Sequence, residues 1–154
     1  MPRSHLNKIV LVAVATWGLD QLSKFSVLKW IPQWATFNQG AAFNLPIPGW
    51  LVAVVFIVLA LLVIWSWKDW QRARLAQLVA LGMVAGGAFS NMWDRLTRGA
   101  VVDFINLRVW PVFNLADTAI VVGLGLLLWY SWRLRNADTS HDGTTKQSIG
   151  RLIR

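Results

Sequence analysis

Aspartate is the only acidic residue type in the chain, which holds seven of them. Asp103 follows two valines in VVDF, and Asp117 lies in FNLADTAI just before a long apolar run. Two carboxylates that meet at the edge of an apolar region cannot both ionise easily, so one of them keeps a proton near neutral pH. A protonated and an ionised carboxyl group side by side can serve as general acid and general base. Asp103 and Asp117 are therefore a candidate pair for splitting an amide bond with an activated water.

Three aspartates near the ends of expected helices also have plainer interpretations. Asp117 would be favoured by the helix dipole if it lay in the first turn of a helix. Asp20 lies four residues before Lys24, which is the spacing of an ion pair on one helix face. Asp94 is next to Arg95 at an expected helix end, where a solvated interfacial charge is ordinary. The sequence alone leaves these alternatives open.

The residue inventory excludes several other chemistries. Cysteine is absent, which excludes disulfides, thiolate metal sites and cysteine nucleophiles. The two histidines, His5 and His141, lie in terminal segments that we expect on the opposite side of a membrane from Ser90, so a Ser-His arrangement is excluded. No HExxH motif or Cys/His cluster suggests zinc. The sequence leaves open a metal site with oxygen ligands, because four aspartates are expected on one side of the membrane. The acid–base pair itself needs no metal and no cofactor.

The composition indicates that these residues sit in a membrane protein. The chain has 154 residues, 56% of them hydrophobic, eleven tryptophans and a mean hydropathy of +0.48, which is too apolar for a soluble domain of this length. Four segments are expected to be transmembrane helices of roughly 16 to 20 residues, long enough for a bilayer. They are about 9–28, 49–67, 75–93 and 115–132. The predicted fold class is an all-α polytopic membrane protein of one domain, residues 1–135.

The first of these segments is less clear than the others, because its unbroken apolar run is short and it contains Asp20 and Lys24. A signal peptide is the alternative, although no convincing cleavage site with small residues follows. The polar residues 136–154 lack any periodicity and are expected to form a disordered tail.

Positive charge predicts the orientation of the four helices. The termini and the short loop after the second helix hold ten of the fifteen Lys and Arg residues, and the other side holds Lys24, Lys29, Arg95, Arg98 and Arg108. Cytoplasmic segments are the more positive ones, so both termini are expected in the cytoplasm. This topology also explains the net charge of +8 without a nucleic-acid partner.

The two outer loops, about 29–48 and 94–114, are rich in β-branched and aromatic residues and are expected to contain short strands at the membrane surface. Asn114 and Asp117 are three residues apart, and Asn91 and Arg95 are four apart. Each pair therefore projects from one helix face toward the same outer surface. Small residues Gly82, Gly86 and Ser90 lie on one face of the third helix and are expected to allow close helix packing.

Four blocks of the sequence resemble lipoprotein signal peptidase, a family of bacterial inner-membrane aspartyl peptidases. They are DQLSK (20–24), NQGAAF (38–43), GGAFSNMWDRLTRGAVVDFI (86–105) and FNLADTAI (113–120), in the order found in the family. The chain departs from the family at position 90, where serine replaces the usual glycine. Four blocks in order are far more specific than any one of them.

The resemblance implies that Asp103 and Asp117 are the catalytic dyad. It implies a substrate site lined by Asn38, Asn91, Arg95 and Asn114, with Asp20 and Gly40 in supporting roles. It also implies four membrane helices with a small extracytoplasmic β-cradle, no cofactor, and an active site at the outer leaflet of the bacterial cytoplasmic membrane. The expected substrate is a prolipoprotein with diacylglyceryl on its cysteine, anchored among membrane lipids and cut just before that cysteine.

Two other classes of protein compete with this interpretation. A proton-coupled transporter component would also place aspartates in a membrane. It needs polar side chains across the bilayer, and the apolar stretches 51–64 and 119–128 offer none. A scaffold protein without chemistry would tolerate asparagine at both Asp103 and Asp117.

Overall fold

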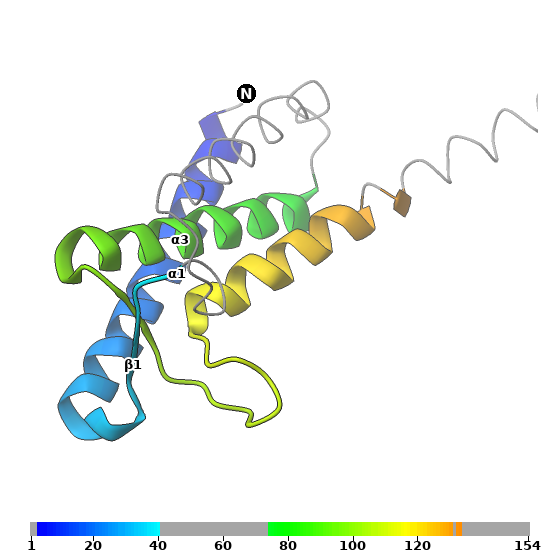
Figure 1. Cartoon of the computed structure of the whole chain (residues 1–154). Helices are drawn as coiled ribbons and strands as arrows, with labels where there is room; N and C mark the ends of the chain where they lie inside the picture. The colour runs from blue at the N-terminus through cyan, green and yellow to red at the C-terminus, as the bar shows by residue number, and fades with distance from the viewer. Residues whose placement is uncertain (1–2, 41–73, 131, 134–154) are drawn as a thin grey trace, which may run out of the picture.

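The computed structural model describes residues 3–40, 74–130 and 132–133 (Figure 1). Three helices dominate these residues. The elements are α1 (Arg3–Trp30), the 3₁₀ helix η1 (Pro32–Trp34), β1 (Thr36–Asn38), α3 (Leu75–Arg98), β2 (Val101–Asp103) and a last helix, Leu115–Tyr130. The helix predicted at 49–67 and the tail predicted at 136–154 lie outside the described residues, so the count of four helices stays a prediction.

Two helices extend beyond the predicted apolar segments. The first was predicted at 9–28 and runs from Arg3 to Trp30, and the third was predicted to end at 93 and runs to Arg98. Polar contacts within the protein, rather than apolar residues, hold the last turns of α3. Gly99 ends the helix with φ +75°, a conformation that favours glycine, and its N–H donates to the carbonyl of Arg95 at 3.1 Å. The chain then turns directly into β2.

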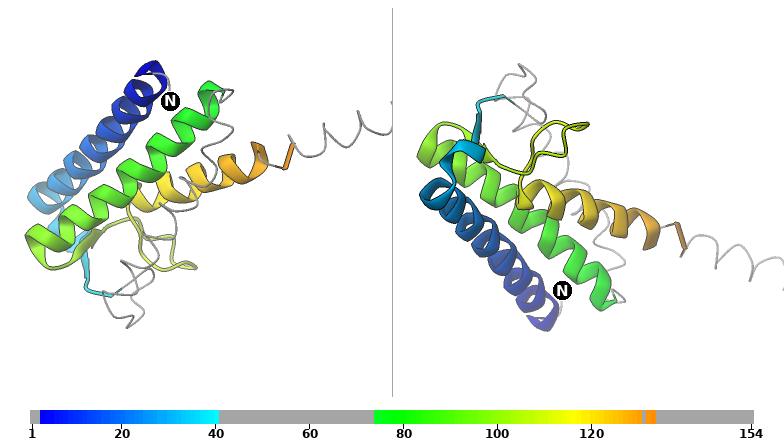
Figure 2. Two further views of the ribbon diagram at one scale, coloured as in Figure 1. Left: turned by 90° about the horizontal axis from the view of Figure 1, so that it is seen from above. Right: turned by 90° about the horizontal axis from the view of Figure 1, so that it is seen from below.

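Helix α3 lies between α1 and the last helix, as both views in Figure 2 show. Glycines allow this close approach. A Cβ atom on Gly82 would lie 2.5 Å from Val12 Cβ of α1, and one on Gly87 would lie 2.5 Å from the carbonyl oxygen of Ala116. Gly86 is equally close to Ala13 of α1. The expected packing role is therefore confirmed for Gly82 and Gly86, whereas Ser90 takes part in hydrogen bonds.

The burial pattern is the reverse of that in a soluble domain. Asp20, Lys24, Ser90, Asp94 and Asn114 are fully buried, whereas many large apolar side chains on the same helices face outward. Those more than half exposed include Leu11, Leu19, Leu22, Val121 and Leu128. Within the described residues, α3 is the one helix both long and apolar enough to cross a membrane, and Leu115–Tyr130 is apolar but shorter. Polar side chains inside and apolar side chains outside are what a lipid solvent favours.

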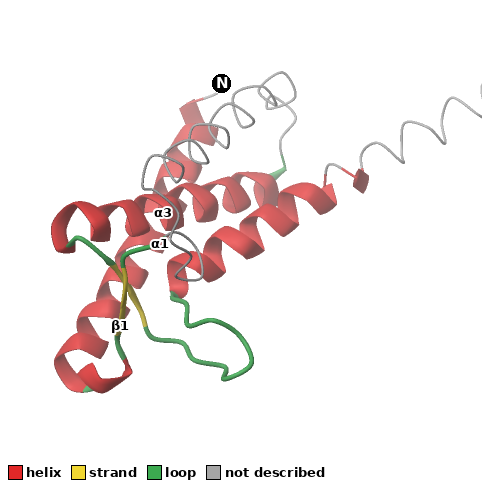
Figure 3. Ribbon diagram, in the orientation of Figure 1, coloured by secondary structure: helices red, strands yellow, loops and turns green. Residues whose placement is uncertain are grey.

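Two short strands meet at the end of the helices where α3 stops (Figure 3). β1 and β2 are antiparallel, with Thr36 opposite Asp103 and Asn38 opposite Val101. Ile105 and Phe113 form an isolated antiparallel bridge that brings the chain back to the last helix. The strands expected in the two outer loops are thus present, and they pair with each other.

Candidate active site

Asp103 is the last residue of β2, and its carboxylate is buried with an exposed fraction of 2%. Asn114 Nδ2 donates to Oδ1 at 2.7 Å, and Asn38 Nδ2 donates to Oδ2 at 3.0 Å. Burial raises the pKa of Asp103 from its ordinary value of 3.8 to about 6; the hydrogen bond from Asn38 opposes this and the charge of Asp117 adds to it. The folded protein therefore favours the protonated form of this carboxyl group more than an exposed aspartate would.

Asp117 lies in the first turn of the last helix, and Asn114 caps that helix. The N–H of Asp117 donates to Asn114 Oδ1 at 2.9 Å, and the N–H of Asn114 approaches Asp117 Oδ2 at 3.4 Å. This reciprocal pair is a capping box. Asp117 Oδ1 also accepts a hydrogen bond from Asn91 Nδ2 at 2.7 Å. The interpretation as a first-turn acid is therefore right, and it does not compete with a role in the site.

Two amide side chains connect the carboxylates. Asn114 Nδ2 donates to Asp103 and also lies 3.2 Å from Asn91 Oδ1, and Asn91 Nδ2 in turn donates to Asp117. The predicted convergence of Asn91, Asn114 and Asp117 is confirmed. The substrate-binding role of the two asparagines stays a prediction, and in this structure their amide groups orient the carboxylates.

The second part of the site, here called the polar wall, consists of Asn38, Gly40 and Arg95. The N–H of Gly40 donates to Asn38 Oδ1 at 3.0 Å, while Arg95 Nη2 donates to the carbonyl of Gly40 at 3.0 Å. Arg95 Nη1 also donates to the carbonyl of Asn91 at 3.2 Å. These bonds tie the end of β1 to α3. One connected set of contacts therefore joins the predicted catalytic and substrate-binding residues with Gly40.

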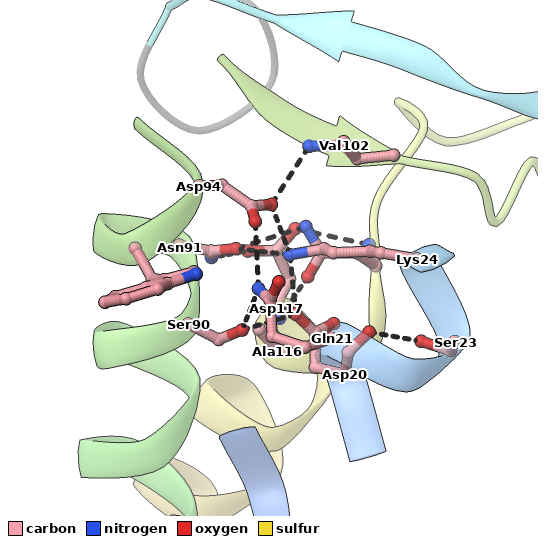
Figure 4. Close-up of polar contacts among 12 residues, drawn as sticks. Asp20, Gln21, Ser23, Lys24, Ser90, Asn91, Asp94, Val102, Ala116 and Asp117 are labelled. Atoms are coloured by element: carbon pink, nitrogen blue, oxygen red, sulfur yellow. Dashed lines mark hydrogen bonds and ion pairs between the residues drawn. The ribbon is translucent and has the colours of Figure 1, made fainter. Parts of the chain in front are cut away.

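A group of charged side chains lies beside the site, and three of its members, Asp20, Lys24 and Asp94, are fully buried (Figure 4). Lys24 Nζ lies 2.5 Å from Asp20 Oδ2 and 2.8 Å from Asp94 Oδ2, and Arg98 pairs with the other oxygen of Asp94. The helix-face ion pair predicted for Asp20 and Lys24 is confirmed. The interfacial interpretation of Asp94 is wrong, because α3 continues past this position and its carboxylate faces the buried side of the helix.

The sequence did not identify Gln21 or Ser90 as members of this group. Gln21 Nε2 donates to Ser90 Oγ at 2.9 Å and to Asp94 Oδ1 at 2.8 Å, and Ser90 Oγ donates to Asp20 Oδ2 at 2.7 Å. Gln21 lies in the DQLSK block, so the sequence did contain a signal that it belongs with these residues. Ser90, the departure from the family's usual glycine, gave no such signal because small residues on α3 suggested packing.

The two pairs of aspartates differ in their partners. Within the described residues, every ion pair involves Asp20 or Asp94. Asp103 and Asp117 accept hydrogen bonds from neutral amide groups instead. A carboxylate without a bonded cation can gain and lose a proton without breaking an ion pair. No group of three or more metal-ligating side chains occurs in the described part of the chain. The arrangement therefore suits acid–base chemistry by Asp103 and Asp117.

Comparison with known proteins identifies the family of the chain. Residues 12–133 match the sequence profile of the signal peptidase (SPase) II family. The lipoprotein signal peptidase of Polynucleobacter necessarius is 37% identical over 150 residues, covering 84% of this chain and 91% of that protein. That of Pelotomaculum thermopropionicum is 50% identical over 94 residues, covering 60% of this chain and 61% of that protein.

Solved structures support the same fold. A bacterial membrane enzyme determined by the in meso method at 2.3 Å resolution has a TM-score of 0.63 at 24% identity, covering 82% of this chain and 88% of that one. A second bacterial membrane enzyme, at 1.9 Å resolution, has a TM-score of 0.59 at 25% identity. Because the family profile matches most of its length, this chain belongs to the signal peptidase II family.

Proposed function

We propose that Asp103 and Asp117 are the catalytic dyad with which the chain removes signal peptides from lipoprotein precursors. The observation that carries this assignment is the contrast between two pairs of aspartates. Asp20 and Asp94 are bonded to cations, whereas Asp103 and Asp117 are held by neutral amide donors. Members of the family act as aspartic endopeptidases, and among the aspartates that the structure describes these two have no bonded cation.

The reaction needs one carboxylate and one carboxylic acid. The ionised member accepts a proton from water, and the resulting hydroxide forms a bond to the carbonyl carbon of the scissile amide. The protonated member then donates to the leaving nitrogen as the C–N bond breaks. The products are the carboxyl end of the signal peptide and the free amine of the next residue. Both groups return to their starting states after a proton passes between them, and no cofactor takes part.

The wall formed by Asn38, Gly40 and Arg95 is proposed to align the substrate. Asn38 and Arg95 contact the chain around the dyad, and each has further donor capacity that a peptide backbone can use. We propose that the substrate is a precursor whose cysteine carries diacylglyceryl, and that the cut falls just before this residue. A lipid anchor would hold the substrate among membrane lipids, so the polar wall would supply alignment more than affinity.

The proposed setting is the bacterial cytoplasmic membrane, crossed four times within residues 1–135. The helix predicted at 49–67 would complete the set. The charge count of ten against five favours cytoplasmic termini and supports this proposed orientation. The dyad, at the opposite end of α3 from its start at Leu75, would then face the outer leaflet. The comparisons give no support to the alternative of a transporter component.

The experiment that tests this proposal compares two forms of one precursor. Purified enzyme in detergent is given the same prolipoprotein with and without diacylglyceryl on its cysteine, and initial rates are measured from the released peptides. Preferential cleavage of the lipidated form, at the bond before the cysteine, is expected. Equal rates for both forms would contradict the lipid-specific substrate and leave only a general membrane aspartic peptidase.

A further inference from the structure

The buried ion pairs beside the site have no part in the proposed chemistry. Lys24 and its partners Asp20 and Asp94 are all fully buried. The lysine Nζ lies within 2.8 Å of one oxygen of each aspartate. Replacing such buried ion pairs with apolar side chains is often neutral or stabilising, so their presence is weak support for a purely structural role. The contacts of the two aspartates point to another one.

Each aspartate also holds a backbone amide that is adjacent to the dyad. Asp20 Oδ1 accepts a hydrogen bond from the N–H of Ala116 at 2.9 Å, and Asp94 Oδ2 accepts one from the N–H of Val102 at 3.2 Å. Ala116 immediately precedes Asp117, and Val102 immediately precedes Asp103. The two contacts therefore fix the backbone directly before each of the proposed catalytic residues.

Lys24 is the link between these two anchors, as Figure 4 shows. Its Nζ also donates to Asn91 Oδ1 at 3.3 Å. That contact occupies the oxygen of Asn91 and so directs the amide nitrogen of Asn91 to Asp117. The lysine, from α1, thus connects α3, β2 and the last helix, and no other side chain in the described residues contacts both Asp20 and Asp94 with a positive charge.

We propose that Lys24 is a positioning residue that sets the separation of the two catalytic carboxylates by holding Asp20 and Asp94 together. It touches neither carboxylate and acts through Ala116, Val102 and Asn91. The inference rests on the assignment of Asp103 and Asp117 as the dyad. A displacement of about 1 Å between catalytic groups can cost about a hundredfold in rate, so a link of this kind has a measurable consequence.

Two variants distinguish the positioning role of Lys24 from its role in neutralising the buried aspartates. Lys24→Met removes the cation and leaves Asp20 without one. The double variant Lys24→Met with Asp20→Asn removes one charge of each sign, and the amide oxygen at position 20 can still accept from Ala116. Lys29→Met is the matched control, because Lys29 is an exposed lysine on the same helix, and within the described residues its ammonium group lies over the rings of Phe25 and Trp30.

The measurements are the melting temperature in detergent, kcat and KM. Lys24→Met is expected to melt at a lower temperature, and the double variant is expected to recover most of that loss. Both are expected to show kcat lowered about ten- to a hundredfold with KM changed little. Lys29→Met is expected to match the wild type. Wild-type kcat in a double variant of restored stability would overturn the positioning role, as would a double variant no more stable than Lys24→Met.

The pH profile of kcat supplies a second readout. Loss of the Lys24 charge by itself raises the pKa of Asp103, so the profile reports charge and displacement together and is read beside kcat and KM. The charges that face the dyad are Lys24 from α1 and Arg95 from α3, with Asp20 behind Lys24, while β1 contributes the neutral Asn38. If the carboxylates move apart in the double variant, they interact less, and the acidic and basic limbs of the kcat profile draw closer together. Limbs at their wild-type positions would contradict the proposal.

Failure of this inference can be told apart from failure of the dyad. Asp103→Asn is assayed in the same series and is expected to be inactive. If Asp103→Asn loses activity and the double variant keeps it, the dyad stands and the positioning role of Lys24 is wrong. If Asp103→Asn keeps activity, the dyad itself is wrong.

Discussion

The buried carboxyl group of Asp103 should make the stability of the protein depend on pH in a direction that identifies it. Burial raises the pKa of Asp103 from 3.8 to about 6, so the folded state favours the protonated form. The contribution of this group to stability is therefore complete below about pH 4 and is lost as the pH rises through 6. Asp103→Asn cannot ionise, so the variant does not suffer this loss.

The size of the effect follows from the two pKa values. A change from 3.8 to about 6 corresponds to roughly 3 kcal/mol when the group is fully ionised, since one pH unit is worth about 1.36 kcal/mol. About half of this loss of stability has already occurred at pH 5, because Asp103 is ionised in the unfolded chain at that pH. A further loss of about 1 to 2 kcal/mol is expected between pH 5 and pH 8. The amide of the variant also faces the donors Asn38 and Asn114, which costs about 1 to 3 kcal/mol. That cost does not vary with pH.

The informative quantity is therefore the change with pH and not the stability at one pH. Melting temperatures of the wild type and of Asp103→Asn are measured in detergent at pH 5 and pH 8. The difference, variant minus wild type, is expected to rise by about 3 to 6 °C between the two conditions. Asp142→Asn makes the same chemical change in the C-terminal segment and should show no such rise. A difference that stays constant, or falls with pH, would refute the argument that burial controls this carboxyl group.

Three further predictions concern substrate alignment, helix packing and membrane topology. Alanine at Asn38 or Arg95 is expected to lower kcat/KM about ten- to a hundredfold without abolishing cleavage. Arg95→Lys should keep only part of the wild-type kcat/KM, because an ammonium group cannot reproduce the two hydrogen bonds of the guanidinium group. Complete loss of cleavage in Asn38→Ala would mean that this residue does more than align the substrate. Gly87→Ala should destabilise the fold by about 1 to 3 kcal/mol, because the new methyl group meets the carbonyl of Ala116, whereas Gly18→Ala, which has open space, should not lower the melting temperature. A C-terminal reporter that is active only in the cytoplasm is expected from the charge distribution, and periplasmic activity would reverse the proposed topology.

Spacing within one element was a reliable guide to this site. The four-residue separation of Asp20 and Lys24 predicted their ion pair, and Asn114 with Asp117 was predicted to project from one helix end. Periodicity of 3.6 residues fixes such neighbours regardless of what the rest of the chain does. The pairing of Asp103 with Asp117 was first suggested by their apolar surroundings, and the ordered blocks supported it, since no local rule relates a strand to the helix that follows it.

Contacts between distant segments could not be predicted in this way. Asp94 was interpreted as interfacial because the apolar run ends beside it, but α3 continues and the carboxylate turns inward to Lys24, 70 positions earlier in the chain. The hydrogen bond of Ala116 to Asp20 joins a backbone amide, which has no sequence signature, to a side chain on another helix. Such pairs depend on how the helices cross, and the crossing depends on the close approach at Gly82 and Gly87.

The assignment of the dyad is tested most directly by the cleavage rates of Asp103→Asn and Asp117→Asn on a lipidated prolipoprotein. An amide can act neither as general acid nor as general base, so each variant is expected to lose at least about a thousandfold in rate. Size-exclusion chromatography and melting temperatures should show that both variants remain folded, and Asp142→Asn should cleave at the wild-type rate. A folded Asp103→Asn or Asp117→Asn enzyme that cleaves within about tenfold of the wild type would contradict the account.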